Sequence, residues 1–389
     1  MKKPFVILLV VLVSLSSYAI NEEKEMAKES GSTSFQPKPL DDDWFKWLVG
    51  QWEGSFESDV GTGKIRTKIE LGLNGQFLIM KSEAKVTEIT NEQRQYLRET
   101  LHASVEDIER FRNSTARELQ IHTIDPKNGE VIGYLFDSFH CIAQGRARRQ
   151  GNKEIIEWKW SALAQGATSI RIIEKINDNK IILNHKYTLP DGNKMEDKAE
   201  MIRKKEIIKD SSSHLFYLKP LDDEWSKWLV GEWKGTVELL GIKSEASKEI
   251  EFGLNEQFLI TKHEHKVTDE AIQKFRKVTH ISDEDAKRYQ SLPFKYLEIL
   301  TIDPKNGDVI GYFFDSMRRV AEGKGKFQGN KEIVEWQWFA QGQRAFSSIR
   351  TVEKVSDDRF IATTKYFAPD GSTMEGKVEM NRTKRKADK

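Results

Sequence analysis

The chain contains two copies of one sequence, and this internal repeat constrains its fold more than any other feature. Segment 38–54 shares 13 of its 17 residues with segment 219–235, and segment 123–137 shares 13 of its 15 residues with segment 301–315. The repeat is far longer than the roughly 20–50 residues of a solenoid unit, so each copy should be a domain with its own core. All ten tryptophans follow the repeat: Trp44, Trp47, Trp52, Trp158 and Trp160 recur as Trp225, Trp228, Trp233, Trp336 and Trp338.

The N-terminal segment, residues 1–19, has the pattern of a secretory signal peptide. Two lysines precede a short apolar run at 5–13, and the small residues Ser17 and Ala19 stand where a cleavage site requires them. We therefore expect a secreted or periplasmic protein that has no stable membrane span after signal cleavage. The alternative is an uncleaved anchor, which the shortness of the apolar run disfavours.

The repeat also predicts the domain boundaries. Residues 20–37 are polar and of low complexity, so we expect a disordered lead-in. Copy one then covers 38–206 and copy two covers 218–385. A linker at 207–217, which contains three consecutive serines, joins them.

Each copy consists mainly of short segments in which apolar and polar residues alternate, as they do in half-buried β-strands. Turn sequences such as Asp-Pro-Lys-Asn-Gly at 125–129 separate these segments. A helical hairpin is predicted at 90–111, with a capping box at Ser104 and Asp107, and again at 268–289. We therefore predict an all-β fold with small helical insertions, in which two tandem antiparallel units of about nine or ten strands each close into a barrel.

Composition excludes several classes of function. The chain has 62 basic and 61 acidic residues, so it lacks the charge excess of a protein that binds nucleic acid. The single cysteine, Cys141, excludes an intrachain disulfide. His263 and His265 share one strand face but lack a third ligand, so no metal site is expected. No sequence pattern indicates a cofactor.

Four residues resemble the signature of the calycin superfamily. Trp52 and Trp233 each belong to a Gly-x-Trp motif on the first predicted strand, and Arg203 and Arg382 stand on the last. With the ordered motifs WLVGxWxG, IDPKNGxVIGYxFDS and PDGxxMExK, both copies resemble an uncharacterised bacterial lipocalin-like β-barrel domain family of unknown function. The resemblance implies two lipocalin-like barrels in which each arginine packs across its tryptophan.

Nitrobindin-like haem proteins are distantly similar to this family. Their iron-binding histidine lies close to the C-terminal strands, where neither copy of this chain has a histidine. His185 lies one strand earlier, and copy two has Thr364 in its place. The resemblance therefore does not imply haem binding here.

Aromatic pairs and isolated arginines suggest a ligand site inside each barrel. Trp158 and Trp160 are two residues apart and share one sheet face, while Arg171 interrupts an apolar strand. An apolar wall with one fixed cation suits a molecule with a hydrophobic body and a carboxylate head. Alternatively, the tryptophans fill a solid core, and the arginines pair with Glu157 and Glu335. The predicted ligand-binding residues are Tyr134, Trp158, Trp160, Arg171 and Tyr187 in copy one, and Tyr312, Trp336, Trp338, Arg350 and Tyr366 in copy two.

Three hypotheses of function follow. In the first, an exported, non-enzymatic tandem barrel binds a small hydrophobic or amphipathic ligand in its interior. In the second, the barrels are solid and serve as a structural or protein-interaction module. The third is an enzyme, for which the recurring histidines His102 and His280 are the sequence argument. An open or filled barrel interior distinguishes the first hypothesis from the second.

Overall fold

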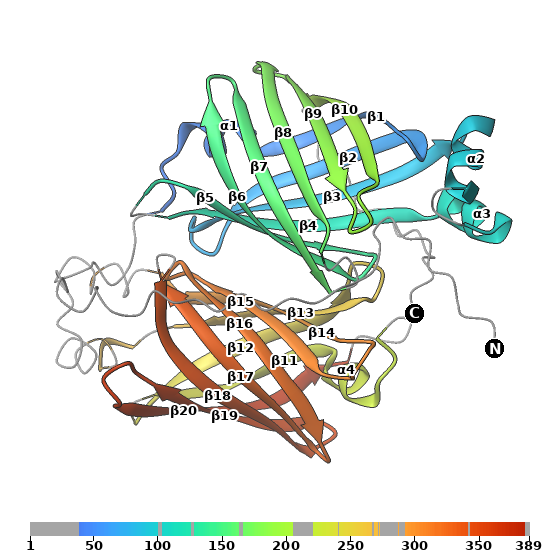
Figure 1. Ribbon diagram of the computed structural model, residues 1–389. Coiled ribbons are helices and arrows are strands. Elements are labelled where there is room, and N and C mark those ends of the chain that lie inside the picture. Colours follow the sequence, from blue (N-terminus) through green and yellow to red (C-terminus); the bar gives the residue numbers. More distant parts are fainter. Residues whose placement is uncertain are drawn as a thin grey trace.

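The protein is a pair of β-barrels joined in one chain (Figure 1). The structure is a computed structural model, and the predicted signal peptide, lead-in and linker lie outside its described residues, as do His102 and His280. The described residues are 39–385 except 100–102, 126–127, 163–165, 205–220, 240, 267, 271, 273–286, 288–291 and 341–342.

Each copy forms a closed antiparallel barrel of ten strands, in which neighbours in the sequence are neighbours in the sheet and the last strand pairs with the first. This confirms the predicted all-β fold with two tandem barrels. Barrel 1 contains β1 (Gly50–Ser58), β2 (Gly61–Gly72), β3 (Phe77–Glu88), β4 (Thr115–Ile124), β5 (Val131–Asp137), β6 (Cys141–Gln150), β7 (Lys153–Ala162), β8 (Thr168–Asn177), β9 (Lys180–Thr188) and β10 (Lys194–Lys204). Barrel 2 contains β11 (Gly231–Leu239), β12 (Ile242–Gly253), β13 (Phe258–His265), β14 (Phe294–Ile302), β15 (Val309–Asp315), β16 (Arg319–Gln328), β17 (Lys331–Ala340), β18 (Gln343–Ser356), β19 (Arg359–Phe367) and β20 (Thr373–Lys384).

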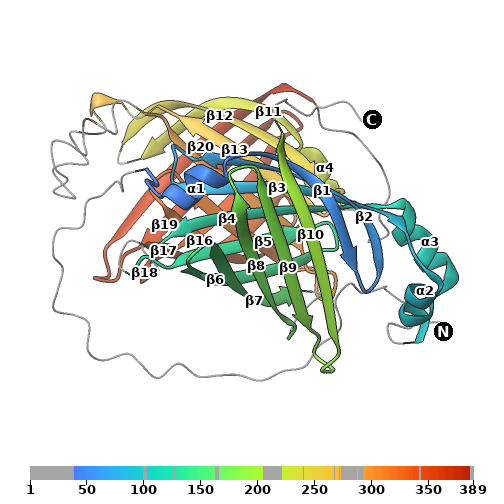
Figure 2. The same cartoon turned by 90° about the horizontal axis from the view of Figure 1, so that it is seen from above.

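Short helices lie at the barrel ends. In barrel 1, α1 (Asp43–Leu48) lies at one end, and α2 (Asn91–Glu99) and α3 (Val105–Asn113) lie at the other (Figures 1 and 2). The predicted capping box is present, because Ser104 and Asp107 each accept the backbone N–H of the other. In barrel 2, α4 (Glu224–Leu229) precedes β11. Within the described ranges, no helix has the length and apolarity needed to cross a membrane.

The interior tryptophans require glycines opposite them. The ring of Trp158 covers Gly133 and Gly145, where an added Cβ would lie 2.8 Å and 2.5 Å from ring atoms. Trp336 has the same relation to Gly311, at 2.6 Å. Since real Cβ atoms do not approach so closely, any larger residue would displace the indole. The glycine of the repeated VIGY motif, which is Gly133 in copy one and Gly311 in copy two, therefore makes room for a core tryptophan.

An arginine and a tryptophan close one end of each barrel. The guanidinium carbon of Arg203 lies 4.3 Å from the ring centroid of Trp52, and its Nη1 donates to the Val49 carbonyl at 2.5 Å. In barrel 2, Arg382 lies 4.0 Å from the ring of Trp233. This is the contact that the calycin resemblance implies. Membership of that superfamily stays a prediction.

We expect Arg203→Lys to lower the free energy of unfolding by about 1–3 kcal/mol, because an ammonium group cannot reproduce the flat, forked contact of the guanidinium. Arg203 donates to the Val49 carbonyl and also to the carbonyls of Trp47 and Asp178. Urea denaturation followed by tryptophan fluorescence measures the change. The control is Arg385→Lys at an exposed position, which should alter stability by less than about 0.5 kcal/mol. Equal effects of the two substitutions would contradict the prediction.

The two barrels pack against each other through their outer faces. The shared apolar cluster comes from both barrels, and its four phenylalanines have no exposed surface. Contacts across the interface have equivalents in which the two copies exchange roles. Phe77 of barrel 1 lies 5.8 Å from Phe314 of barrel 2, and their counterparts Phe258 and Phe136 lie 5.9 Å apart. The buried members are Phe77, Leu119, Ile121, Tyr134, Phe136, Ile142, Phe258, Leu297, Ile299, Phe314 and Val320.

Hydrogen bonds across this interface also occur in equivalent pairs, made by corresponding residues of the two copies. Asn74 Nδ2 donates to the Pro293 carbonyl at 2.9 Å, and its counterpart Asn255 donates to the Thr115 carbonyl at 3.1 Å. Gln76 Oε1 accepts from Arg318 Nε at 3.1 Å, while its counterpart Gln257 contacts His140 at 3.2 Å. The interface is therefore built like the two-fold interface of a homodimer, with both halves in one chain.

The prediction that Tyr134 and Tyr312 line the barrel interiors is wrong. Their ring centroids lie 6.0 Å apart in the inter-barrel cluster, on the outer faces of β5 and β15. The neighbouring Leu135 belongs to the interior cluster of barrel 1 instead. Because β5 is apolar on both faces, its sequence does not indicate which face is inside.

Candidate functional site

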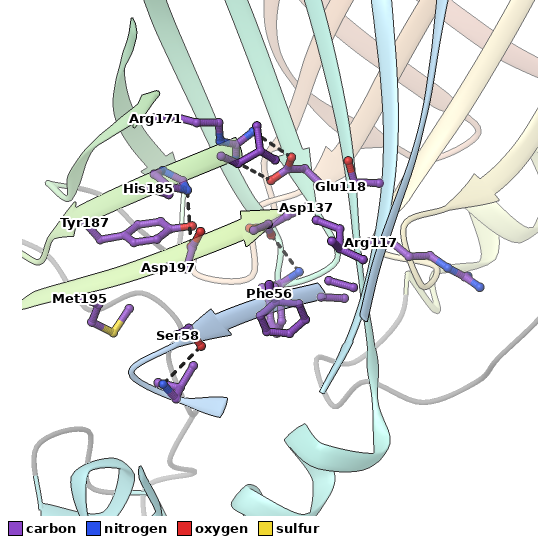
Figure 3. Close-up of a pocket in the computed structure, with 18 of the residues that line it drawn as sticks. Phe56, Ser58, Arg117, Glu118, Asp137, Arg171, His185, Tyr187, Met195 and Asp197 are labelled. Atoms are coloured by element: carbon purple, nitrogen blue, oxygen red, sulfur yellow. Dashed lines mark hydrogen bonds and ion pairs between the residues drawn. The ribbon is translucent and has the colours of Figure 1, made fainter. Parts of the chain in front are cut away.

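Barrel 1 contains a cavity of about 210 Å³ (Figure 3). A cavity of this size has room for several waters or a small organic molecule. The cavity is bounded by Phe111 of α3 and by Val60 in the turn between β1 and β2. Much of its remaining wall is apolar, including Phe56, Ile65, Met80, Val86, Ile173, Leu183 and Met195.

A buried ion pair lies at the wall of the cavity. Arg171 on β8 donates through both terminal nitrogens to the two carboxylate oxygens of Glu118 on β4, at 3.2 Å each. Arg171 is 8% exposed, so this pairing offsets the cost of removing its charge from water. The alternative that Arg171 pairs with Glu157 is wrong, because Glu157 lies outside the barrel and pairs with Arg148 at 2.5 Å. Arg171 is therefore not a free cation awaiting an anionic ligand.

A chain of polar contacts leads from Trp160 to Asp197. Trp160 Nε1 donates to Ser169 Oγ at 2.9 Å, and Ser169 Oγ lies 2.9 Å from His185 Nε2. With Ser169 donating to Nε2, the ring proton is on Nδ1, which lies 3.7 Å from Asp197 Oδ2. Burial and the nearby Arg171 lower the pKa of His185 well below its usual value, so the ring is neutral at pH 7.

Asp197 on β10 lines the cavity next to Tyr187 (Figure 3). The Tyr187 hydroxyl donates a hydrogen bond to the Asp197 carboxylate. Burial raises the pKa of Asp197 to about 6, against the opposing effects of Arg171 and of the tyrosine hydrogen bond. The nearby charge of Glu118 raises it further. A carboxylate with such a pKa lacks full compensation for its negative charge.

Asp137 at the end of β5 adds a further carboxylate to the cavity. Its Oδ1 accepts the backbone N–H groups of Phe139 and Cys141, at 2.8 Å and 2.9 Å, and so caps the turn between β5 and β6. Burial raises the pKa of Asp137 to about 7, and the charge of Glu118 contributes. The two backbone hydrogen bonds act in the opposite direction. The residue therefore has a structural role and also adds negative charge to the cavity.

The structure separates the predicted site residues of copy one. Trp160, Arg171 and Tyr187 line the cavity, whereas Trp158 is buried in the core of the barrel. Tyr134 lies at the inter-barrel interface. Three of the five residues predicted for copy one thus line the cavity, and the other two do not.

The corresponding interior of barrel 2 is filled by aromatic rings. His263 stacks on Tyr296 at 4.3 Å between centroids, and Phe313 lies 4.3 Å from Tyr296. Phe313 also lies 4.9 Å from Trp338, Trp338 stacks on Phe346 at 5.1 Å, and Phe346 lies 5.9 Å from Tyr366. Because these contacts are continuous, the described part of barrel 2 has a solid interior where barrel 1 is hollow.

Arg350 and Trp336, the remaining predicted site residues of copy two, belong to this solid core. The guanidinium carbon of Arg350 lies 5.1 Å from the Trp336 ring centroid. Its Nη2 pairs with Glu298 at 2.5 Å and with Glu332 at 3.0 Å, not with Glu335. The alternative of a filled core therefore holds for copy two.

Substitutions between the copies explain the difference in packing. Ser82, Ala84 and Ala116, all at the cavity of barrel 1, correspond in the repeat to His263, His265 and Phe294. Glu118 likewise corresponds to Tyr296. Larger side chains thus occupy in barrel 2 the space that barrel 1 leaves open.

Sequence reasoning missed Glu118 and Asp197 as cavity residues. Asp197 had a usable signal, because it alternates with Met195 and Ala199, which are buried. An acidic residue on the apolar side of a strand indicates a functional or paired group. Glu118 had no comparable signal. Among the described residues, no group of three His, Cys, Asp or Glu side chains is arranged to hold a metal ion.

No protein-family model matches the chain, and no curated protein matches it. Similar solved structures include a protein of unknown function from the DUF3598 family of Nostoc punctiforme, with 11% identity, 88% of this chain and 100% of that chain covered, and a TM-score of 0.21. The S-type phycobiliprotein lyase of Guillardia theta has 12% identity, 42% and 93% coverage and a TM-score of 0.27. A mutant transferrin binding protein B of Haemophilus parasuis has 10% identity, 70% and 66% coverage and a TM-score of 0.19. At these TM-scores the similarities support no conclusion about function.

Proposed function

We propose that this protein is an exported, non-enzymatic binding protein that takes a small, partly apolar molecule into the cavity of barrel 1. The observation that carries the proposal is the cavity of about 210 Å³, whose surface is mostly apolar and also carries charged and polar side chains such as Arg171 and Asp197. Binding sites for small molecules commonly have this composition. The signal-peptide pattern of residues 1–19 supports export.

Barrel 2 has a different role in this proposal. Its described interior is filled by side chains, which favours a structural or interaction module for this copy. The shared interface then fixes the hollow barrel to a solid one. Its larger interior side chains, such as His265 where barrel 1 has Ala84, agree with a copy that does not bind a ligand.

An enzyme is the weaker alternative. Ser169, His185 and Asp197 occur in the order of a catalytic triad, with Ser169 Oγ 2.9 Å from the imidazole. However, Ser169 is 3% exposed, is not among the residues that line the cavity, and accepts the indole N–H of Trp160. Ser348 of barrel 2 holds Trp338 in the same way without a histidine. The serine is therefore explained by its tryptophan, and labelling of Ser169 by a fluorophosphonate would favour the enzyme instead.

The proposal predicts that filling barrel 1 with the residues of barrel 2 abolishes binding. We expect the double variant Ala84→His, Ala116→Phe to lose at least about tenfold in affinity for the neutral probe 2-phenylethanol, a change of about 1.4 kcal/mol. The reason is steric, because both residues line the cavity and their counterparts occupy this space in barrel 2. Isothermal titration calorimetry on the full chain measures the affinity, and native mass spectrometry detects a co-purifying ligand.

The control is Lys85→His, which places the same side chain on the same strand but outside the barrel. This variant should bind as the natural chain does. If the natural chain carries no co-purifying ligand and does not bind 2-phenylethanol, or if the filled variant binds equally well, ligand binding in barrel 1 is refuted. Circular dichroism confirms that each variant is folded.

A further inference from the structure

The charges around the cavity of barrel 1 do not balance. Of the residues that line it, Arg117 and Arg171 carry a fixed positive charge. Arg117 pairs with Glu83 through Nε at 3.2 Å, and it points away from the cavity (Figure 3). Arg171 therefore remains as the cation inside the barrel among the lining residues, and it is bonded twice to Glu118. The acidic residues that line the cavity are Asp59, Glu118, Asp137, Glu196 and Asp197, of which Glu196 pairs with Lys186 at 2.8 Å.

In barrel 2, the positions of Asp137 and Asp197 carry no unpaired acidic side chain. Asp315, the counterpart of Asp137, pairs with the Arg319 guanidinium at 2.7 Å, and Arg319 stands where barrel 1 has Cys141. The counterpart of Asp197 is Gly376. In barrel 2, the counterpart of Asp137 is thus paired with an arginine, and the counterpart of Asp197 is not acidic. The uncompensated acids occur in the barrel that has a cavity.

A buried carboxylate without a cation is costly, so its presence needs a reason. Asp137 has a structural role, because its Oδ1 caps the turn between β5 and β6. Asp197 has no comparable structural role, because its contacts are the Tyr187 hydroxyl and the distant His185 ring. Its side chain is 30% accessible although it lies inside the barrel, so that its free surface faces the cavity. A positively charged group in the cavity would supply the missing compensation.

We propose that the ligand of barrel 1 is a small organic cation, a protonated amine on an apolar body, whose ammonium group is bound by Asp197 with Asp137 nearby. This inference rests on the proposed function and specifies its ligand class. The apolar body would lie against Phe56, Ile65 and Met80, and aromatic rings add favourable contacts for a cation.

Other ligand classes fit these residues less well. A carboxylate would meet an acidic lining and an arginine that is already bonded twice to Glu118. A metal ion needs several ligands at one point, and the described residues contain no such group. The charge of Arg171 thus stabilises the acidic residues of the cavity and is not available to bind an anion.

Three probes of similar shape and different charge test the inference on the full chain: phenethylamine, 2-phenylethanol and phenylacetate. By isothermal titration calorimetry we expect phenethylamine to bind at least about tenfold more tightly than 2-phenylethanol, and phenylacetate to bind most weakly. If 2-phenylethanol binds but phenethylamine is no tighter, the amine class is overturned while ligand binding stands. If none of the three binds, the amine class is overturned together with the proposed function.

The substitution Asp197→Asn separates charge from shape. We expect it to weaken phenethylamine binding at least about tenfold and to change 2-phenylethanol binding less than about threefold. The 2-phenylethanol titration also shows that the variant keeps its cavity. Equal losses for both probes, or no loss for the amine, would overturn the role of Asp197.

The affinity for the amine should also depend on pH. A bound ammonium favours the ionised carboxylate, so the pKa of Asp197, about 6 in the free protein, falls on binding. Phenethylamine affinity should therefore fall as pH decreases from about 7.5 to 5, since a primary amine stays protonated up to about pH 10. The affinity for 2-phenylethanol should change little, and parallel pH profiles for the two probes would overturn the inference. The charged and titratable groups facing Asp197 are Asp59, Glu118, Asp137, Arg171, His185 and Tyr187.

Discussion

Replacing Arg171 by methionine should lower the free energy of unfolding of barrel 1 by about 3–5 kcal/mol at pH 7. Arg171 is buried and makes two hydrogen bonds to Glu118, and its charge also lowers the pKa of Asp197. Methionine keeps the length of the side chain but leaves the carboxylates without a cation. Urea denaturation monitored by tryptophan fluorescence measures the loss.

The pH dependence of this loss has a definite sign. Without Arg171, the folded-state pKa of Asp197 rises further above its value in the unfolded chain. An acid whose pKa is raised by folding destabilises the folded state when ionised, and this cost disappears as pH falls towards the unfolded pKa of about 4. The difference between Arg171→Met and the natural chain should therefore be larger at pH 8 than at pH 5.

Two controls accompany this substitution. Arg148→Met removes an exposed partner of Glu157 and should cost no more than about 1 kcal/mol. The double variant Arg171→Met, Glu118→Met should recover part of the loss, because it removes both charges of the pair. A loss for Arg171→Met no greater than that for Arg148→Met would refute the argument from burial.

Placing a carboxylate in the inter-barrel cluster should separate the two barrels. We expect Phe314→Asp to cost about 3–5 kcal/mol of stability, because Phe314 has no exposed surface and packs against Phe77, Tyr134 and Phe136. Opening the interface returns the new charge to water, so the favoured response is separation of otherwise intact barrels. Small-angle X-ray scattering should show a larger radius of gyration, and unfolding should divide into two transitions.

The two-fold arrangement of the interface supplies a further check. Phe136→Asp, the equivalent change in barrel 1, should have the same effect as Phe314→Asp, since the two residues make equivalent contacts. Ile349→Asp, on an exposed outer face of barrel 2, is the control and should change stability by less than about 0.5 kcal/mol. An unchanged radius of gyration in both phenylalanine variants would mean that the cluster does not hold the barrels together.

The interface also explains which parts of the two copies stayed alike. In a self-complementary interface each residue meets the partner of its counterpart, so a change in one copy affects contacts made by both. The near-identical text at 123–137 and 301–315 contains Tyr134, Phe136 and their counterparts. Some interior positions, which face only their own barrel, differ between the copies, as Ala84 and His265 show, whereas the interior tryptophans are the same in both.

The sequence alone determined the features that depend on neighbours along the chain. Alternation of apolar and polar residues and the turn residues predicted antiparallel strands, and the repeat predicted two domains, because these signals come from the local backbone. The capping box at Ser104 and Asp107 was readable because its partners are three residues apart. The contact of Arg203 with Trp52 came from the resemblance, which carries information about spatial neighbours.

Only the tertiary structure decided which face of each strand is inside and which charges meet. Alternation gives two faces, and on β5 both are apolar, so Tyr134 was assigned to the wrong one. Arg171 bonds to Glu118, which is 53 residues away and reaches it across the barrel, whereas the local pattern pointed to Glu157. The cavity depends on the combined volume of side chains from many strands, and one sequence position does not encode that sum.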